Sequence, residues 1–540
     1  MRRLKQLINP TQIPSLLLTT AIATTLLLGC EGGAPSGSTN YSVEADSQPS
    51  LPTDPTSESE EAEPDLQTQS PDFNTEEYDR IYENPFLSVT QNPLSTFSID
   101  VDTASYANTR RFLAENRLPP PDAVRLEEMI NYFDYDYPQP SGEDPFSITT
   151  ELATAPWNSE HELLLVGLKG RHFEAEALPP SNLVFLLDVS GSMDEPNKLP
   201  LMKASMRLLV EQMGEQDRIS IVVYAGAAGV VLESTPGNEV DRILTAIDAM
   251  EAGGSTAGGA GIEMAYQVAK ENFLPNGNNR VILATDGDFN VGPSSDAELI
   301  RLIEAKRDDG IFLTVLGLGT GNYQDAKMEQ LANKGNGNYA YLDSLLEAKK
   351  ALVTEMGSTL VTIAKDVKLQ IEFNPAMVKA YRLLGYENRV LNAEDFNDDQ
   401  KDAGELGAGH SVTALYELIP ADSQASLPEV DPLQYQQSTV LPSVDLLTLK
   451  LRYKRPNEDT SELLQQALQR NDIWQSSPSE NMQFASAVAE FGLLLRGSQY
   501  KADASYEAVL TRAGQAQGAD FYGYRTEFLD LVEQAELLSR

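Results

Sequence analysis

The sequence predicts a multidomain protein whose centre, residues 181–360, is a doubly wound α/β domain flanked by a β-sandwich and helical segments. Three observations predict this organisation. Apolar runs without period-two alternation, such as 183–187 and 280–284, are typical of strands buried on both faces of a sheet. These runs alternate with amphipathic segments, which favours mostly parallel pairing. At 540 residues the chain is also long enough for roughly three domains of ~150 residues.

The first 29 residues predict a lipoprotein signal peptide, because a basic start precedes an apolar, Thr-rich stretch. The closing residues Leu27-Leu28-Gly29-Cys30 resemble a bacterial lipobox. That resemblance implies that Cys30 carries the lipid, palmitate included, and becomes the mature N-terminus. An ordinary cleaved signal peptide with an incidental cysteine is the alternative. Because Cys30 is the single cysteine, no disulfide bond within the chain can hold the fold.

Residues 30–83 predict a disordered acidic tether. Carboxylates, Pro, Ser, Thr and Gln dominate this stretch, and one base, Arg80, leaves like charges to repel. We expect the lipid at Cys30 to hold the protein at a membrane, in the periplasm or at the cell surface, with the outer membrane favoured. The net charge of -41 argues against nucleic-acid binding.

The region before the α/β domain, residues 84–180, predicts a helical pair followed by strands. Asp102 to Ser105 can cap a helix that runs to about Asn116, and a second helix follows the Pro-rich break after Leu118. The strands are expected at 146–153 and 162–168.

The α/β domain itself is predicted from alternating strands and helices. The strands are expected at 183–187, 218–224, 229–233, 280–284, 311–316 and 338–342, and the helices at 198–213, 239–250, 259–273, 295–309, 325–333 and 344–358. Ligands of such a domain gather at the carboxyl ends of its strands.

The region after the α/β domain divides into two parts. Longer extended runs predict a β-rich domain at 361–455. Because strands precede and follow the α/β domain, we expect it to be inserted into one β-sandwich built from both flanks. Residues 456–540 return to helical spacing, with Phe484, Val488 and Phe491 on one face, and predict a C-terminal helical region.

One acidic turn, Asp188-Val189-Ser190-Gly191-Ser192, follows the first apolar strand. Oxygen ligands at alternate positions of such a loop suit a hard cation, since Mg2+ prefers near-octahedral oxygens at ~2.1 Å and keeps water or a partner's oxygen in part of its shell. Two more strand-end loops can reach the same edge: the glycine-rich loop 253–259, which carries Thr256, and Thr285-Asp286-Gly287-Asp288. We therefore predict a metal site there.

These residues, Asp188-x-Ser190-x-Ser192, Thr256 and Asp286-Gly287, resemble the metal-ion-dependent adhesion site (MIDAS) of von Willebrand factor A domains. The resemblance implies that both serines and Thr256 contact Mg2+, or Mn2+ or Ca2+, directly or through water. It implies that Asp188 and Asp286 act largely through water, which leaves a position for a carboxylate from a protein partner. The alternative is a polar turn that caps the next helix. Asp194 and Asp288 lie near enough in sequence to add outer charge or to be solvated.

The resemblance extends beyond this domain. The stretches 98–106, 384–389 and 490–496 are similar to flanking segments of the YfbK-like bacterial lipoproteins, a largely uncharacterised family. The similarity covers most of residues 84–540 and leaves out the tether. It supports the architecture more than it specifies a function.

Several motifs are set aside. Gly317 to Gly321 mimics a dinucleotide loop but lacks the final glycine spacing and an acidic residue for a ribose, so we interpret it as a turn. The run 395–399 begins like an EF-hand, but Gln400 and Leu406 stand where Gly and Glu are needed, which indicates an acidic surface loop and leaves only weak calcium binding open. The isolated histidines disfavour a zinc or triad site; they are His161, His172 and His410.

The function that these patterns favour is a lipid-anchored envelope protein that binds a protein partner through a divalent metal, without catalysis. A metal-assisted hydrolase is the first alternative, although no general base with an orienting partner is evident. A scaffold in which the metal only stabilises the fold is the second.

Overall fold

The computed structural model describes residues 75–540, except 174–177, 255–258, 288–294, 356–360, 426, 428–433 and 436–438. The predicted signal peptide at 1–29, Cys30 and the tether as far as residue 74 lie outside the described residues. None of the helices in the described ranges is both long and apolar enough to span a bilayer.

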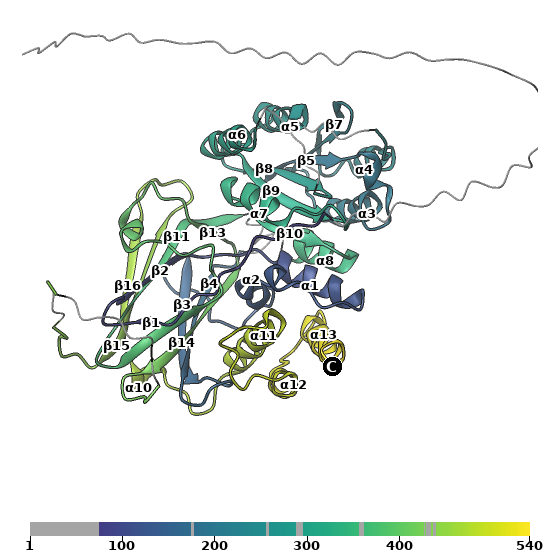
Figure 1. The fold of residues 1–540 in the computed structure, drawn as a ribbon. Helices are drawn as coiled ribbons and strands as arrows, with labels where there is room; N and C mark the ends of the chain where they lie inside the picture. The colour runs from purple at the N-terminus through teal and green to yellow at the C-terminus, as the bar shows by residue number, and fades with distance from the viewer. Residues whose placement is uncertain are drawn as a thin grey trace, which may run out of the picture. The chain divides into compact units, whose positions relative to one another are not determined.

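The central sheet has six strands in the order β10-β9-β8-β5-β6-β7 (Figure 1). All neighbours pair in parallel except β6 and β7, which are antiparallel. The strands are β5 (Ser181–Asp188), β6 (Arg218–Tyr224), β7 (Ala228–Pro236), β8 (Asn278–Thr285), β9 (Phe312–Leu318) and β10 (Tyr339–Leu342). The predicted doubly wound α/β domain is confirmed.

Both faces of this sheet are covered. Leu183, Phe185 and Leu187 of β5 pack into one buried cluster, and Val184 and Leu186 pack into another on the opposite face. The first cluster includes side chains of α3 (Leu199–Val210), α4 (Val240–Asp248) and α8 (Leu345–Lys349) with its π-helical extension (Lys350–Thr354). The second includes side chains of α5 (Gly259–Glu271), α6 (Asp296–Asp308) and α7 (Asp325–Lys334). Burial on both faces explains the lack of alternation in the strand sequences.

Two antiparallel sheets form the flanking sandwich. One has the order β1-β12-β14-β4-β3, and the other has β13-β11-β15-β16 with β2 paired to β11. Their strands are β1 (Leu87–Ser88), β2 (Leu94–Ser98), β3 (Phe146–Thr154), β4 (Glu162–Gly170), β11 (Thr362–Phe373), β12 (Val378–Leu384), β13 (Gly404–Gly407), β14 (Ser411–Pro420), β15 (Asp445–Lys454) and β16 (Glu462–Gln469). Strands from before the α/β domain pair with strands from after it: β4 with β14, and β2 with β11. The predicted insertion is confirmed.

Five helices outside the α/β domain share one apolar core: α1 (Ala104–Ala114), α2 (Leu126–Asn131), α11 (Glu480–Arg496), α12 (Tyr506–Gln515) and α13 (Tyr524–Leu538). The short turn η1 (Pro121–Ala123) lies between α1 and α2 in the chain, and Ile473 of α10 (Arg470–Ile473) packs into the core of the sandwich instead. Phe484, Val488 and Phe491 are fully buried in the core that the five helices share, as the helical spacing predicted. The carboxylate of Asp102 does not cap α1 but accepts a hydrogen bond from Tyr339 N at 2.7 Å, which ties the helix start to β10.

Residues 462–469, predicted to be part of the helical region 456–540, form strand β16 instead. Their Leu, Gln and Ala side chains favour helix in isolation. However, β15 pairs with β11 on one side and with β16 on the other, so strand formation here satisfies backbone groups that would otherwise be left at an open edge.

Residues 75–77, predicted to belong to the tether 30–83, hydrogen-bond to the α/β domain. Thr75 N donates to Gly321 O at 2.7 Å, and Glu77 N donates to Tyr323 O at 3.0 Å. The Glu76 carboxylate pairs with Arg111 at 3.0 Å. A cation on α1 therefore compensates one of the charges that were expected to stay solvated, and the ordered chain begins earlier than the composition indicated.

Candidate functional site

The first loop of the predicted site turns directly at the end of β5. Asp188 is fully buried, and its Oδ1 accepts a hydrogen bond from Ser190 N at 2.8 Å. The hydroxyl oxygens of Ser190 and Ser192 lie 3.1 Å apart, so both face the same side of the turn. A short 3-10 helix, Gly191–Asp194, follows and sharpens the turn. Ser192 is exposed, so the turn opens toward solvent at that end.

The second loop meets the first through its backbone. Gly253 N donates to Val189 O at 2.7 Å, and Gly191 N donates to Gly254 O at 3.1 Å. Gly254 has a φ of 90°, a conformation that glycine adopts without strain. Thr256 itself lies outside the described residues, but the glycines that precede it in the chain contact the Asp188 turn.

The third loop places Asp286 at the end of β8, beside β5 in the sheet. Asp286 is fully buried, and among the described residues its Oδ1 has no hydrogen-bond partner. Gly287 has a φ of 117°, and a Cβ at this position would overlap Asn322 O. Glycine is therefore required for the turn that follows Asp286. Asp288 lies outside the described residues.

Two carboxylates meet at this edge of the sheet. Burial raises the pKa of Asp188, hydrogen bonds from Ser190 oppose that rise, and the negative charge of Asp286 adds to it. Two buried acids that disfavour each other's ionised form are stabilised by a cation between or beside them. The donor set of carboxylates and hydroxyls is the kind that Mg2+ prefers, and Asp286 Oδ1, which has no partner among the described residues, fits the ligand shell of such an ion. Asp194 is exposed to solvent.

A lysine that the sequence analysis did not single out completes the site. Lys198 precedes α3, is buried, and donates from Nζ to Asp286 Oδ2 at 3.2 Å and to Ser192 O at 3.0 Å. It therefore links the first loop to the third. A cation at a helix N-terminus opposes the helix dipole, and this unfavourable position is the one sequence signal that could have identified Lys198.

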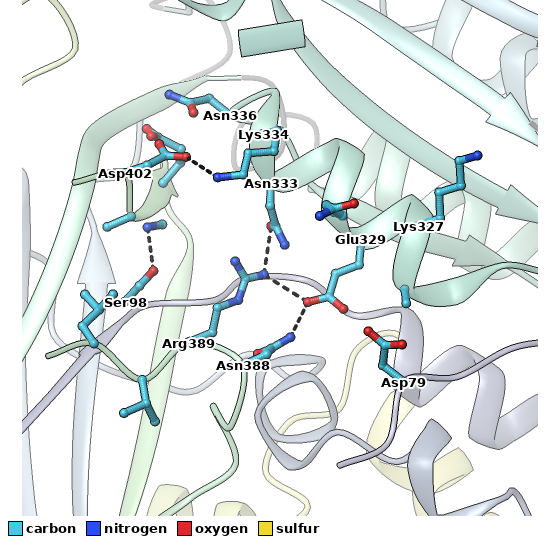
Figure 2. A pocket seen from close by; sticks show the side chains of 18 of the residues that line it. Asp79, Ser98, Lys327, Glu329, Asn333, Lys334, Asn336, Asn388, Arg389 and Asp402 are labelled. Atoms are coloured by element: carbon cyan, nitrogen blue, oxygen red, sulfur yellow. Dashed lines mark hydrogen bonds and ion pairs between the residues drawn. The ribbon is translucent and has the colours of Figure 1, made fainter. Parts of the chain in front are cut away.

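A separate polar pocket of about 690 Å³ lies between α7 and the sandwich loops 388–391 and 401–405 (Figure 2). Arg389 extends across it and pairs with Glu329 at 3.5 Å and Asn333 at 2.9 Å. Asn388 donates to the same glutamate at 2.6 Å. The pocket shares no residue with the Asp188 turn, and these polar groups pair with one another across its walls.

Three buried carboxylates beside this pocket, Asp100, Glu128 and Glu329, have oxygens within 4.8 Å of one another. Every one of those oxygens is already bound. Arg389 holds Asp100 at 3.1 Å, and Arg125 holds Glu128 at 3.1 Å and Glu329 at 3.0 Å. The cluster is a satisfied ionic network rather than an open cation site.

The motifs that were set aside have structural roles. Gly319 and Gly321 have positive φ angles of 70° and 95° in the turn that follows β9. In the EF-hand-like run, the Asp399 carboxylate accepts a hydrogen bond from Ser461 Oγ, so it anchors the loop to the chain before β16. His161 pairs with Glu417 at 2.5 Å, inside the sandwich.

Family models match most of the described chain. A von Willebrand factor type A domain model matches residues 182–355, a model named for the C-terminal part of uncharacterized protein YfbK matches residues 358–538, and a von Willebrand factor model matches residues 72–165. The boundaries of the type A domain model follow those of the central sheet and its helices.

Similar proteins include an uncharacterized protein YfbK of Escherichia coli (strain K12), which is 46% identical over 473 residues, 86% of this chain and 81% of that protein. The human inter-alpha-trypsin inhibitor heavy chain H3 is 26% identical over 48% of this chain and 31% of its own length. Among solved structures, a von Willebrand factor type A protein from Catenulispora acidiphila has a TM-score of 0.41 at 15% identity, over 74% of this chain and 91% of that one.

Proposed function

Because the chain belongs to the YfbK family and contains a von Willebrand factor A domain, we propose that it binds a protein partner in a divalent-metal-dependent way. Domains of this type commonly mediate metal-dependent protein interactions. The observation that carries the proposal is the convergence of two buried carboxylates, Asp188 and Asp286, with the Ser190 and Ser192 hydroxyls at the carboxyl edge of the sheet.

In the proposed site Ser190, Ser192 and Thr256 hold Mg2+ through their hydroxyls, and Asp188 and Asp286 supply the compensating charge. The bound ion supplies an electrophilic centre with an incomplete protein shell, to which a carboxylate of the partner binds. Asp188 is held by Ser190 N and Asp286 by Lys198, so the chain fixes both acids before the ion arrives. Pre-positioned ligands reduce the ordering cost of binding. The proposed function contains no catalytic step.

We further propose that the protein is anchored in the cell envelope by a lipid on Cys30, with the outer membrane or cell surface favoured. The basic start, the apolar stretch and Leu27-Leu28-Gly29-Cys30 support this part of the proposal. The acidic residues after Cys30 would hold the binding site away from the bilayer, because like charges extend a chain.

The test is a calorimetric titration of the detergent-solubilised full chain with MgCl2, followed by retention of envelope proteins with Mg2+ and with EDTA. Saturable Mg2+ binding and a set of retained proteins that EDTA releases are expected. If Mg2+ binds and raises the melting temperature while retention is the same in EDTA, the ion is only structural. If no divalent ion binds, the proposal is wrong.

A further inference from the structure

Lys198 is built into the edge of the sheet at which the proposed ion would bind. Its side chain is 4% exposed, and its ammonium lies 3.2 Å from Asp286 Oδ2 and 3.0 Å from Ser192 O. The only other carboxylate that the structure pairs with it, among the described residues, is Glu195 at 3.8 Å, which is largely exposed. The ammonium therefore contacts Asp286 and Ser192 and is shielded from solvent.

The stem of Lys198 is held in place by the turn after β9. A Cβ on Gly319 would overlap the Cε and approach the Cδ and Cγ of Lys198, so only glycine lets the side chain pass. Gly319 has a φ of 70°, and its carbonyl accepts a hydrogen bond from Tyr341 Oη at 2.6 Å, which fixes the turn. The stem therefore runs directly along the backbone of this turn, and its ammonium is positioned by Asp286 and Ser192.

The two oxygens of Asp286 have different roles. Oδ2 accepts from Lys198, whereas Oδ1 has no partner in the described part of the chain. A divalent ion can therefore act on Oδ1 while the ammonium stays on Oδ2. The lysine is placed to remain beside a bound ion, not to block its position.

The net charge of Asp188, Asp286 and Lys198 determines how strongly the site would bind a metal ion and then an anion. Asp188, Asp286 and Lys198 together carry one net negative charge, and a divalent ion would convert it to one net positive charge. Without the lysine, the two remaining carboxylates would carry two negative charges, and the site would become neutral when it binds a divalent ion. A neighbouring cation weakens the binding of a metal ion and strengthens the binding of an anion to the loaded site.

We propose that Lys198 is a positioning residue that lowers the affinity of the site for divalent metal and raises the affinity of the metal-loaded site for a carboxylate. This inference rests on the proposed metal-dependent function. It assigns a second, fixed cation to the partner-binding surface, and it favours partners that present an acidic side chain over neutral oxygen ligands.

The first experiment is calorimetric titration of MgCl2 into the wild-type chain, Lys198→Met and Lys198→Gln. Methionine keeps most of the stem, and glutamine keeps a donor for Ser192 O, so either variant that folds tests the inference. Both are expected to bind Mg2+ about tenfold or more tightly than the wild type, the size expected for one unit charge acting on a divalent ion through water. Affinity that is equal or weaker in the folded variants overturns the inference.

Lys203→Met is the matched control. Lys203 lies on α3, the helix that Lys198 precedes, and its ammonium donates to the backbone carbonyls of Asp248 and Met250 at 3.1 and 3.0 Å. Its loss is expected to leave Mg2+ affinity unchanged. If the wild type and all variants bind no metal, the proposed function itself fails. If the wild type binds metal and the Lys198 variants do not bind it more tightly, only the inference about Lys198 fails.

The second experiment tests whether Lys198 strengthens the binding of a carboxylate to the metal-loaded site, with acetate as the probe. Mn2+ replaces Mg2+, and broadening of the acetate 13C carboxyl resonance reports entry into the ion's shell. At equal metal loading, the wild type is expected to broaden the resonance several-fold more than Lys198→Met. Equal or greater broadening in Lys198→Met contradicts the proposed role in anion binding.

Discussion

The guanidinium of Arg110 forms a two-pronged ion pair with the carboxylate of Asp343, with Nε–Oδ2 and Nη2–Oδ1 distances of 2.6 Å each. Arg110 lies on α1, and Asp343 follows β10 in the α/β domain. The same guanidinium reaches Glu347 of α8 at 2.7 Å and Glu527 of α13 at 3.0 Å. One buried side chain therefore joins the end of the von Willebrand factor A domain to both flanking helical segments.

Arg110→Met is expected to lower the free energy of unfolding by about 3–5 kcal/mol, because it leaves buried carboxylates without their cation. The positive charge of Arg110 matters here because the acids that it pairs with are shielded from water: the side chain of Glu347 is 1% exposed. Urea unfolding of the wild type and of Arg110→Met measures this decrease in the free energy of unfolding. Arg207→Met is the control, since the Arg207–Asp248 pair is exposed and should contribute less than about 1 kcal/mol. Equal losses in both variants would contradict this account.

Gly492→Ala is expected to destabilise the protein even though alanine favours helix. Gly492 lies in α11, and an added Cβ would overlap Leu126 Cδ2 of α2 in the shared core. Overpacking of this kind costs about 1–3 kcal/mol, more than the ~1 kcal/mol gain in helix propensity.

Gly514→Ala in α12 provides the opposite case, because a Cβ there meets nothing within 4 Å. It should raise the melting temperature while Gly492→Ala lowers it. Calorimetric melting of both variants checks the pair, and a higher melting temperature for Gly492→Ala would show that α2 and α11 can separate.

His410 is expected to make the protein less stable in mild acid. Burial lowers the pKa of His410 to about 4, whereas the unfolded chain titrates near pH 6.5. Between these values the unfolded state binds more protons, so the free energy of unfolding falls as the pH falls through that window.

Relative to His410→Gln, the wild type should lose about 2 kcal/mol between pH 7.5 and pH 5. Urea unfolding at both pH values measures the difference. A curve for His410→Gln that runs parallel to that of the wild type would contradict the expected titration.

Asp188→Asn is expected to weaken Mg2+ binding at least about tenfold, because it removes one of the two charges that the ion would compensate. Asp194→Asn, a few residues along the same turn, changes an exposed carboxylate and should alter the affinity by less than about threefold. Calorimetry on both variants distinguishes ligand charge from general acidity of the loop. A similar loss in both would mean that the whole turn, and not Asp188, attracts the ion.

Cys30→Ser is expected to move the protein from the membrane fraction to the soluble fraction, because the substitution removes the proposed lipid attachment site. Cell fractionation measures the shift, and mass spectrometry of the wild-type N-terminus identifies the lipid. A wild-type N-terminus without a lipid adduct would contradict the anchor and leave metal binding untouched.

The features that sequence reasoning predicted well depend on local pattern. The run Leu183 to Leu187 correctly predicted a strand buried on both faces, because a strand with one face in water would alternate apolar and polar residues. Asp188 and Asp286 were predicted to meet because parallel strands bring their carboxyl ends to one edge, and β5 and β8 are neighbours in the sheet.

The features that it missed depend on contacts between distant segments. Residues 462–469 have helical preferences, and only the free edge of β15 makes them a strand. Lys198 reads as an ordinary surface lysine until the turn at Gly319 confines its stem and Asp286 receives its ammonium. Composition placed Glu76 in a solvated tether, whereas Arg111 gives it a partner.

The insertion of the α/β domain between β4 and β11 has a consequence for synthesis of the chain. Strand β4 ends at Gly170, and its neighbour β14 begins at Ser411, so the ribosome completes the whole inserted domain before that pair can form. Until then the β3–β4 hairpin presents an open edge that attracts other strands. Folding of the insert would bring its two ends together and reduce the entropy of closing the sandwich. Folding of the α/β domain thus also helps the two halves of the sandwich to pair with each other.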